Sequence, residues 1–267
     1  MAVSARDKFT YHYYREFMSS LRETYRFTTF KEGKRIVGES DSPLLILRHD
    51  IDMELEAAFR MSLLENSLGV HSTYFLMVSC PLYNVFSGNG AEQVRQILAA
   101  GHHFGLHFDC ALYRDISADN IDHYVSRECH LLESFFRQPV EAVSFHRPGG
   151  LELSGVELAR LPNSYEMIFR KKFEYFADSR GDWARGNPLE SQAFLANKNL
   201  HICIHPIWWT EEPKAPFECL VDLVQRIGIR NEQYLSENCS VWDEGKRARG
   251  NLTLERGIRE ELDVEAI

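Results

Sequence analysis

The sequence predicts an α/β fold with a parallel sheet of six or seven strands, either open or closed into a barrel. Two observations lead to this prediction. Short apolar segments alternate with amphipathic helical segments, at a spacing of about 25 to 35 residues, which is typical of βα units. Hydrophobic residues make up 44% of the 267 residues, which is enough to fill a large core and argues against extensive disorder.

The first elements follow from local periodicity. Residues 9–25 are loosely amphipathic and predict a helix. Residues 44–48 form a short apolar run, which favours a buried strand. In residues 54–67 apolar side chains recur at i, i+4 and i+8, so we expect a helix there.

The same alternation continues through the middle of the chain. Residues 72–78 are β-branched and aromatic and predict a strand. Residues 91–100 place three aliphatic side chains on one helical face, and Gly101 follows where a C-terminal cap is expected. Residues 103–108 predict the next strand, and residues 119–137 carry the clearest helical stripe in the sequence.

The remaining elements are shorter. Residues 140–145 predict a strand that runs into the sequence HRPGG, and a short helix is expected near 154–160. Residues 173–177 and 200–204 predict two more strands, and 216–229 a helix. We expect one domain over residues 1–267, with a core of about 40–230 and a charged peripheral tail of 231–267, either a surface helix or partly disordered.

Bulk properties exclude several classes of function. The net charge of -9 argues against a partner such as nucleic acid or an anionic membrane, which would require a basic surface. There is no apolar stretch near 18 residues and no export signal, so we expect no membrane span and a cytoplasmic location. The six cysteines are scattered without a CxxC pair, which favours free thiols.

Polar side chains gather at the carboxyl ends of the predicted strands. Because these ends face one rim of a parallel sheet or barrel, the side chains should converge on one pocket. The residues concerned, in chain order, are His49, Asp50, Asp52, His107, Asp109, His146, Arg147, Asp178, Arg180, Asp182 and His205.

The types of these side chains suggest metal-assisted hydrolysis of an amide or ester. Two or three imidazoles and a carboxylate can bind Zn²⁺ or a similar divalent ion and leave a position open for water. A second carboxylate is then available as a general base, and another histidine as a general acid. Neither a nucleophile elbow nor a glycine-rich phosphate loop is apparent in the sequence.

Six segments together resemble the polysaccharide deacetylase superfamily, carbohydrate esterase family 4. They occur in the family's order between about residue 44 and residue 209. The segments are RHDID, STYFL, GHHFGLHFD, SFHRPGG, YFADSRGDW and IHPIWW. The resemblance is strongest to a divergent, often cytoplasmic branch that begins RHDxD. It implies a distorted (β/α) barrel, usually of seven strands, and metal-dependent deacetylation.

The resemblance also implies roles for individual residues. Asp50 would be the base, Asp52 a metal ligand, His107 a second ligand and His205 the general acid. Arg147 would steady the base, and one further carboxylate, Asp178, would orient the acid or a supporting arginine. The spacing Asp-Ile-Asp differs from the adjacent aspartates of secreted members, so the base and the ligand could be exchanged.

One position departs from the family pattern. Ala111 stands where the second ligand histidine is expected, four residues after His107. His146 is the expected replacement, which gives the ligand set Asp52, His107 and His146. By alternation along their strands, His49 and His102 should face away from these groups and serve packing. The tryptophans that follow His205 could line a sugar pocket or belong to the core.

The leading hypothesis is a metal-dependent hydrolase, with zinc as the expected ion, that removes an acyl group from an amino sugar or related N-acyl substrate. One alternative is a catalytically inactive barrel that binds a saccharide or a protein. Another is a hydrolase of other C–N bonds, such as those of cyclic amides or formamides.

Overall fold

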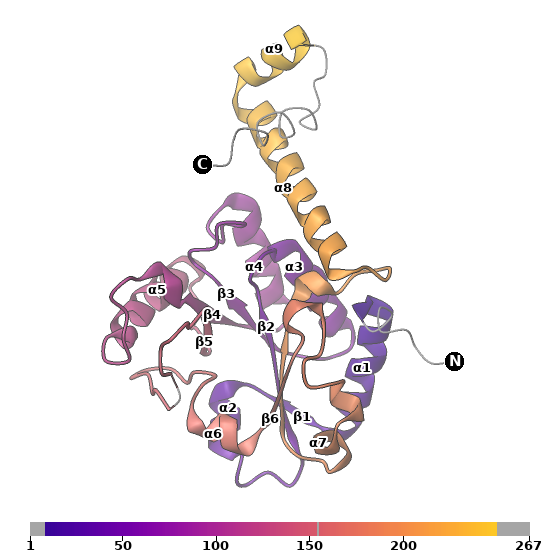
Figure 1. Ribbon diagram of the computed structural model, residues 1–267, viewed down its shortest axis with the longest axis vertical. Coiled ribbons are helices and arrows are strands. Elements are labelled where there is room, and N and C mark those ends of the chain that lie inside the picture. Colours follow the sequence, from indigo (N-terminus) through magenta and orange to yellow (C-terminus); the bar gives the residue numbers. More distant parts are fainter. Residues whose placement is uncertain (1–8, 154, 250–267) are drawn as a thin grey trace, which may run out of the picture. The chain divides into compact units, whose positions relative to one another are not determined.

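The computed structural model describes residues 9–153 and 155–249 (Figure 1). The chain divides into two compact units, Met1–Cys219 and Leu220–Ile267. The first unit holds the sheet and every candidate site residue. None of the helices in the described part of the chain combines the length and the apolar character that are needed to cross a bilayer.

The first unit is built on a sheet whose seven strands all pair in parallel. The strand order is β5-β4-β3-β2-β7-β6, and β1 pairs with the first half of β2. Pairing ends at β5 and β6, so the structure is an open, distorted α/β barrel, which confirms the predicted fold class. The strands are β1 Arg26–Thr28, β2 Leu44–Asp50, β3 Thr73–Leu76, β4 His103–Asp109, β5 Val143–His146, β6 Glu174–Ala177 and β7 Leu200–Ile204.

Helices surround this sheet (Figure 1). They are α1 Tyr11–Thr24, α2 Phe30–Ile36, α3 Leu55–Ser67, α4 Gly88–Ala99, α5 Ile121–Phe136, α6 Met167–Lys172 and the single turn α7 Gln192–Leu195. Side-chain oxygens of Thr10, Thr29 and Ser87 accept hydrogen bonds from the first turns of α1, α2 and α4, where backbone N–H groups have no partner within the helix. α8 Pro216–Asn238 begins in this unit and continues into the second, which also contains α9 Ser240–Arg249.

Short elements account for most differences from the sequence prediction. β1 and α2 were not predicted, because three and seven residues are too few to show a reliable period. No helix forms over residues 155–160, where Gly155 has a φ of 82°, outside the helical region. The predicted tail, expected as a surface helix or partly disordered, is helical as far as Arg249, and its residues 250–267 lie outside the described part.

β2 is the central strand and is buried along its whole length. β1 and β3 flank its two halves on one side, and β7 flanks it on the other. Because alternate side chains of a strand point to opposite faces, Arg48 and Asp50 share one face and His49 lies on the other. The two faces carry separate clusters of buried polar groups.

The cluster on the His49 face is centred on the carboxylate of Glu65 in α3, which is fully buried. His49 Nε2 lies 2.9 Å from Oε1, and the Ser72 hydroxyl donates to Oε2 at 2.6 Å. The hydroxyls of Tyr14 and Tyr74 also donate to this carboxylate. These bonds tie α1 and α3 to β2 and β3. The predicted packing role of His49 agrees with this arrangement.

Glu65 remains ionised in this buried setting. Burial alone would raise the pKa of Glu65, but His49 and the hydrogen bonds lower it to about 2. His102 lies 3.6 Å from Glu65 Oε2 and belongs to the same cluster, so it also faces away from the rim, as its place in the strand predicts.

We expect Glu65→Gln to lower the free energy of unfolding by about 3 kcal/mol at pH 7, because it removes the negative charge of a carboxylate that forms hydrogen bonds with four side chains. Since the folded pKa of about 2 lies below the ordinary 4.5, the carboxylate stabilises the fold fully above pH 4.5. That stabilisation is lost as the pH falls from 4.5 toward 2. Urea denaturation should therefore show a smaller difference between variant and wild type at pH 3 than at pH 7.

Glu23→Gln, at an exposed position of α1, is the matched control and should leave the free energy of unfolding unchanged. If Glu65→Gln is as stable as this control at pH 7, the cluster does not anchor the helices.

Candidate active site

Side chains from four strand ends meet at the rim of the barrel. Nε2 of His107, in β4, lies 2.9 Å from Oδ1 of Asp52, which follows β2. Nδ1 of His146, at the end of β5, lies 3.3 Å from the same oxygen and 3.2 Å from His107 Nε2. His205, after β7, places Nε2 3.8 Å from Asp52 Oδ2. The structure thus brings together the three residues expected as metal ligands and the histidine expected as the acid.

A buried hydroxyl defines which nitrogen of His107 carries the proton. Ser144, on β5, donates its single proton to Oδ1 of Asp50 at 3.2 Å. It must then accept a hydrogen bond from His107 Nδ1, which lies 2.6 Å away. This tautomer leaves a lone pair on His107 Nε2, directed at Asp52 and His146. Orientation of an imidazole through its other ring nitrogen is the usual support for a metal ligand.

One carboxylate oxygen and two imidazole nitrogens therefore face a common point. One atom from each of Asp52, His107 and His146 lies within 4.8 Å of the others. Burial alone would raise the pKa of Asp52, but the neighbouring imidazoles of His107 and His146 hold it well below its usual range. An ionised carboxylate and a neutral imidazole with a free lone pair are the donors that a divalent ion such as Zn²⁺ requires, so these residues fit a metal ion.

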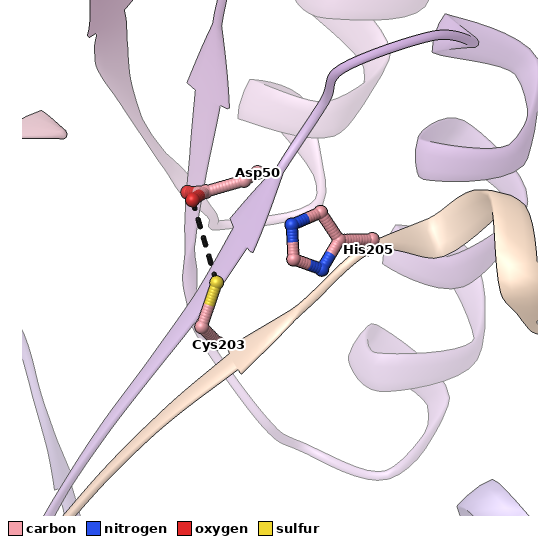
Figure 2. Close-up of side chains that lie close together, drawn as sticks. All are labelled: Asp50, Cys203 and His205. Carbon is pink, nitrogen blue, oxygen red and sulfur yellow. Dashed lines mark hydrogen bonds between the residues drawn. The ribbon is translucent and has the colours of Figure 1, made fainter. Parts of the chain in front are cut away.

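A second group of donor side chains lies beside the first. It contains Asp50, Cys203 and His205, which Figure 2 shows converging from β2 and from the end of β7. The Cys203 thiol donates to Asp50 Oδ2 at 3.4 Å, and burial raises the pKa of this thiol well above its ordinary range. Because the thiol keeps its proton and the carboxylate already has a cationic partner, this group suits a metal ion poorly.

That cationic partner is Arg48, from the same strand. Arg48 Nη2 lies 3.1 Å from Asp50 Oδ2, and both side chains are buried. Burial alone would raise the pKa of Asp50, but Arg48 lowers it below its ordinary value. Asp50 is therefore ionised, and its oxygens accept hydrogen bonds from Ser144 and Cys203 as well.

The structure corrects the expected position of Arg147. The Arg147 side chain is 59% exposed and pairs with Asp109 instead of Asp50. The Arg147 backbone has a φ of 46°. The arginine beside the expected base is Arg48, which the sequence analysis missed. Strand alternation could have found it, because residues 48 and 50 lie two apart in β2 and must share a face.

His205 is held by a buried carboxylate. Asp178, which is fully buried, accepts hydrogen bonds from His205 Nδ1 at 2.7 Å and from the His205 backbone N–H at 2.8 Å. Burial would lower the pKa of His205, but Asp178 raises it to about 9. Trp209 Nε1 donates to the other Asp178 oxygen at 2.8 Å and is itself buried against Phe9, Tyr13, Tyr14 and Phe17. Trp209 is therefore part of the core.

No family model matches the sequence, and no curated protein matches it. Solved structures with a similar arrangement include a carbohydrate esterase family 4 pseudoenzyme from Bacillus anthracis, with 15% identity and a TM-score of 0.42 over 71% of this chain and 62% of that one. A second is a Streptococcus pyogenes deacetylase in complex with acetate, with 15% identity and a TM-score of 0.41 over 80% of this chain and 86% of that one. A third is a cobalt-bound family 4 acetyl xylan esterase from Clostridium thermocellum, with 14% identity and a TM-score of 0.39 over 70% of this chain and 84% of that one.

The chain thus spans less than two thirds of the length of the pseudoenzyme. Identities of 14–15% give no information on the activity, substrate or partners of this chain.

We expect the purified protein to bind about one equivalent of Zn²⁺ in calorimetric titration, and Asp52→Ala to lose this binding because the anionic donor is removed. Ser144→Ala should retain binding but weaken it by about 10- to 100-fold, since His107 loses the partner that fixes its tautomer. Ser134→Ala, exposed on α5, is the matched control and should bind as wild type. Equal affinity in wild type and Asp52→Ala would contradict the assignment.

Proposed function

We propose that the protein is a divalent-metal-dependent hydrolase that removes an acyl group, such as acetyl, from the nitrogen of an amino sugar or a related N-acyl compound. The observation that carries this proposal is the convergence of Asp52, His107 and His146 beside an ionised carboxylate, Asp50, and a carboxylate-supported imidazole, His205. This set contains every group that hydrolysis of an amide requires.

Asp52, His107 and His146 would hold the metal ion. When bound, such an ion lowers the pKa of a water molecule and polarises a carbonyl group. Asp50 accepts the proton of the attacking water, which it can do because Arg48 keeps it ionised in a buried position. Ser144 connects Asp50 to His107, so a single hydroxyl positions both the base and a ligand.

His205 supplies the proton for the departing amine. Its Nδ1 is hydrogen-bonded to Asp178, which leaves Nε2 as the position from which a proton can be given up. Nε2 faces the side of Asp52 that His107 and His146 do not occupy, because it lies near Oδ2 and they lie near Oδ1. The proposed base, Asp50, and the proposed acid, His205, therefore lie at the ends of two neighbouring strands, β2 and β7.

The saccharide substrate is proposed from the likeness of the sequence segments to polysaccharide deacetylases. The same chemistry would also hydrolyse a cyclic amide or a formamide. A panel of N-acetylated and N-formylated amino sugars together with cyclic amides distinguishes these substrates. Zinc binding without turnover of any member of the panel would instead favour a binding module.

Asp50→Asn should retain zinc binding and lose at least about 100-fold in turnover on the best substrate of the panel, because an amide cannot accept the proton of water. Asp119→Asn, at an exposed position, is the matched control. Acyl release is measured by the appearance of the free amine, and zinc binding by calorimetry. Normal turnover of Asp50→Asn would show that the base is another group, Asp52 being the first to test.

His205→Ala should reduce amide hydrolysis by about 10²- to 10⁴-fold, the usual effect of removing a general acid. The same variant should hydrolyse 4-nitrophenyl acetate almost as well as wild type, because nitrophenolate departs without a proton. Asp50→Asn should lose both activities. A His205→Ala variant that loses ester and amide hydrolysis equally would rule out the acid role.

A further inference from the structure

A separate cavity of about 360 Å³ is lined in part by Arg48. Segments near the open edge of the barrel form its walls, from the residues after β5 through α6 to β6 and β7. None of Asp50, Asp52, His107, His146 and His205 lines it. Its polar lining consists mainly of Arg48, Ser164, Arg170, Tyr175, Arg185 and His201.

Arg48, one of the lining residues, has donor atoms without a partner. The residue is only 5% exposed, and its Nη2 lies 3.1 Å from Asp50 and 3.5 Å from the Tyr175 hydroxyl. Its Nε and Nη1 are buried and have no hydrogen-bond partner among the described residues. Buried guanidinium nitrogens are normally paired, so two unpaired nitrogens on a residue that lines a cavity point to a missing acceptor.

Two further polar atoms of the lining residues are also buried without a hydrogen-bond partner. Ser164 Oγ and His201 Nε2 have no partner in the described structure, and both residues are more than 90% buried. The hydroxyl can donate a hydrogen bond, and a neutral imidazole can donate from one nitrogen. Burial and the charge of Arg48 keep the pKa of His201 well below its ordinary value, so its ring is neutral.

The charge of the residues that line the cavity favours an anionic ligand. The lining contains three guanidinium groups, those of Arg48, Arg170 and Arg185, and one carboxylate, that of Glu174, which lies 3.6 Å from Arg185 Nη1. Even with Asp50, which pairs with Arg48 from outside the lining, the positive groups outnumber the carboxylates. This excess of positive charge occurs in a protein whose net charge is -9. Guanidinium groups pair preferentially with carboxylates and phosphates, which accept several hydrogen bonds at once.

We propose that this cavity binds a small ligand through an oxyanion group, either a carboxylate or a phosphate, which accepts hydrogen bonds from Arg48. The volume suits a small molecule, and Phe169 and Phe173 offer apolar surface to the remainder of the ligand. The proposal goes beyond acyl hydrolysis and does not depend on it, because the cavity shares no lining residue with the candidate metal group.

Calorimetric titration with inorganic phosphate and with acetate, at constant ionic strength maintained with chloride, tests the proposal. Wild type should show saturable binding of at least one of the two anions at one site. Arg48→Gln should abolish this binding, and Arg170→Gln should weaken it by about tenfold. Arg15→Gln, exposed on α1, removes the same charge elsewhere and should bind as wild type.

Asp52→Ala separates this site from the metal centre, and it should bind the anions as wild type does. Arg170 is exposed, so its variant is informative even if Arg48→Gln fails to fold, which circular dichroism would reveal. The proposal is overturned if neither anion binds above the chloride baseline. It is also overturned if Arg170→Gln binds like Arg15→Gln, or if binding disappears in Asp52→Ala, which would place the anion at the metal centre.

Discussion

The ion pair between Arg48 and Asp50 is the interaction on which the polar interior of the barrel depends. Both residues lie on β2, the central strand, and both side chains are buried. A lone carboxylate in this position would take up a proton, because burial raises its pKa, and a lone guanidinium would be strongly unfavourable. Each charge is tolerated because the other is present. The sheet can therefore carry a permanently ionised carboxylate to the edge of a candidate catalytic site.

From this pair a chain of hydrogen bonds leads to the rim of the barrel. Asp50 accepts from Ser144, Ser144 accepts from His107, and His107 presents its remaining nitrogen to Asp52. The order of donors is fixed at one end, since an ionised Asp50 can only accept. The tautomer of His107 therefore follows from the ionised state of Asp50, two hydrogen bonds away. A buried ion pair in the core therefore determines which nitrogen of His107 is available to a metal ion.

The sequence predicts the fold and the convergence of the site better than it predicts the partners within the site. Strand-end positions indicated that Asp52, His107, His146 and His205 would meet, because parallel strands end at one rim. The partner of Asp50 was assigned to Arg147 by resemblance, whereas alternation within β2 points to Arg48. Glu65 was not identified at all, since a single acidic residue in an amphipathic helix gives no sign that it will be buried.

The chemistry of the guanidinium group explains why arginine suits position 48. An ammonium group has one nitrogen, and a lysine paired with Asp50 would keep its donors close to a single acceptor. The planar guanidinium places one nitrogen on Asp50, and its other two nitrogens have no partner among the described residues, while the residue lines the cavity. One buried cation can thereby hold the expected base in its ionised form and still offer donors to a second anion. Arg48 thus both contacts the expected base and lines the cavity.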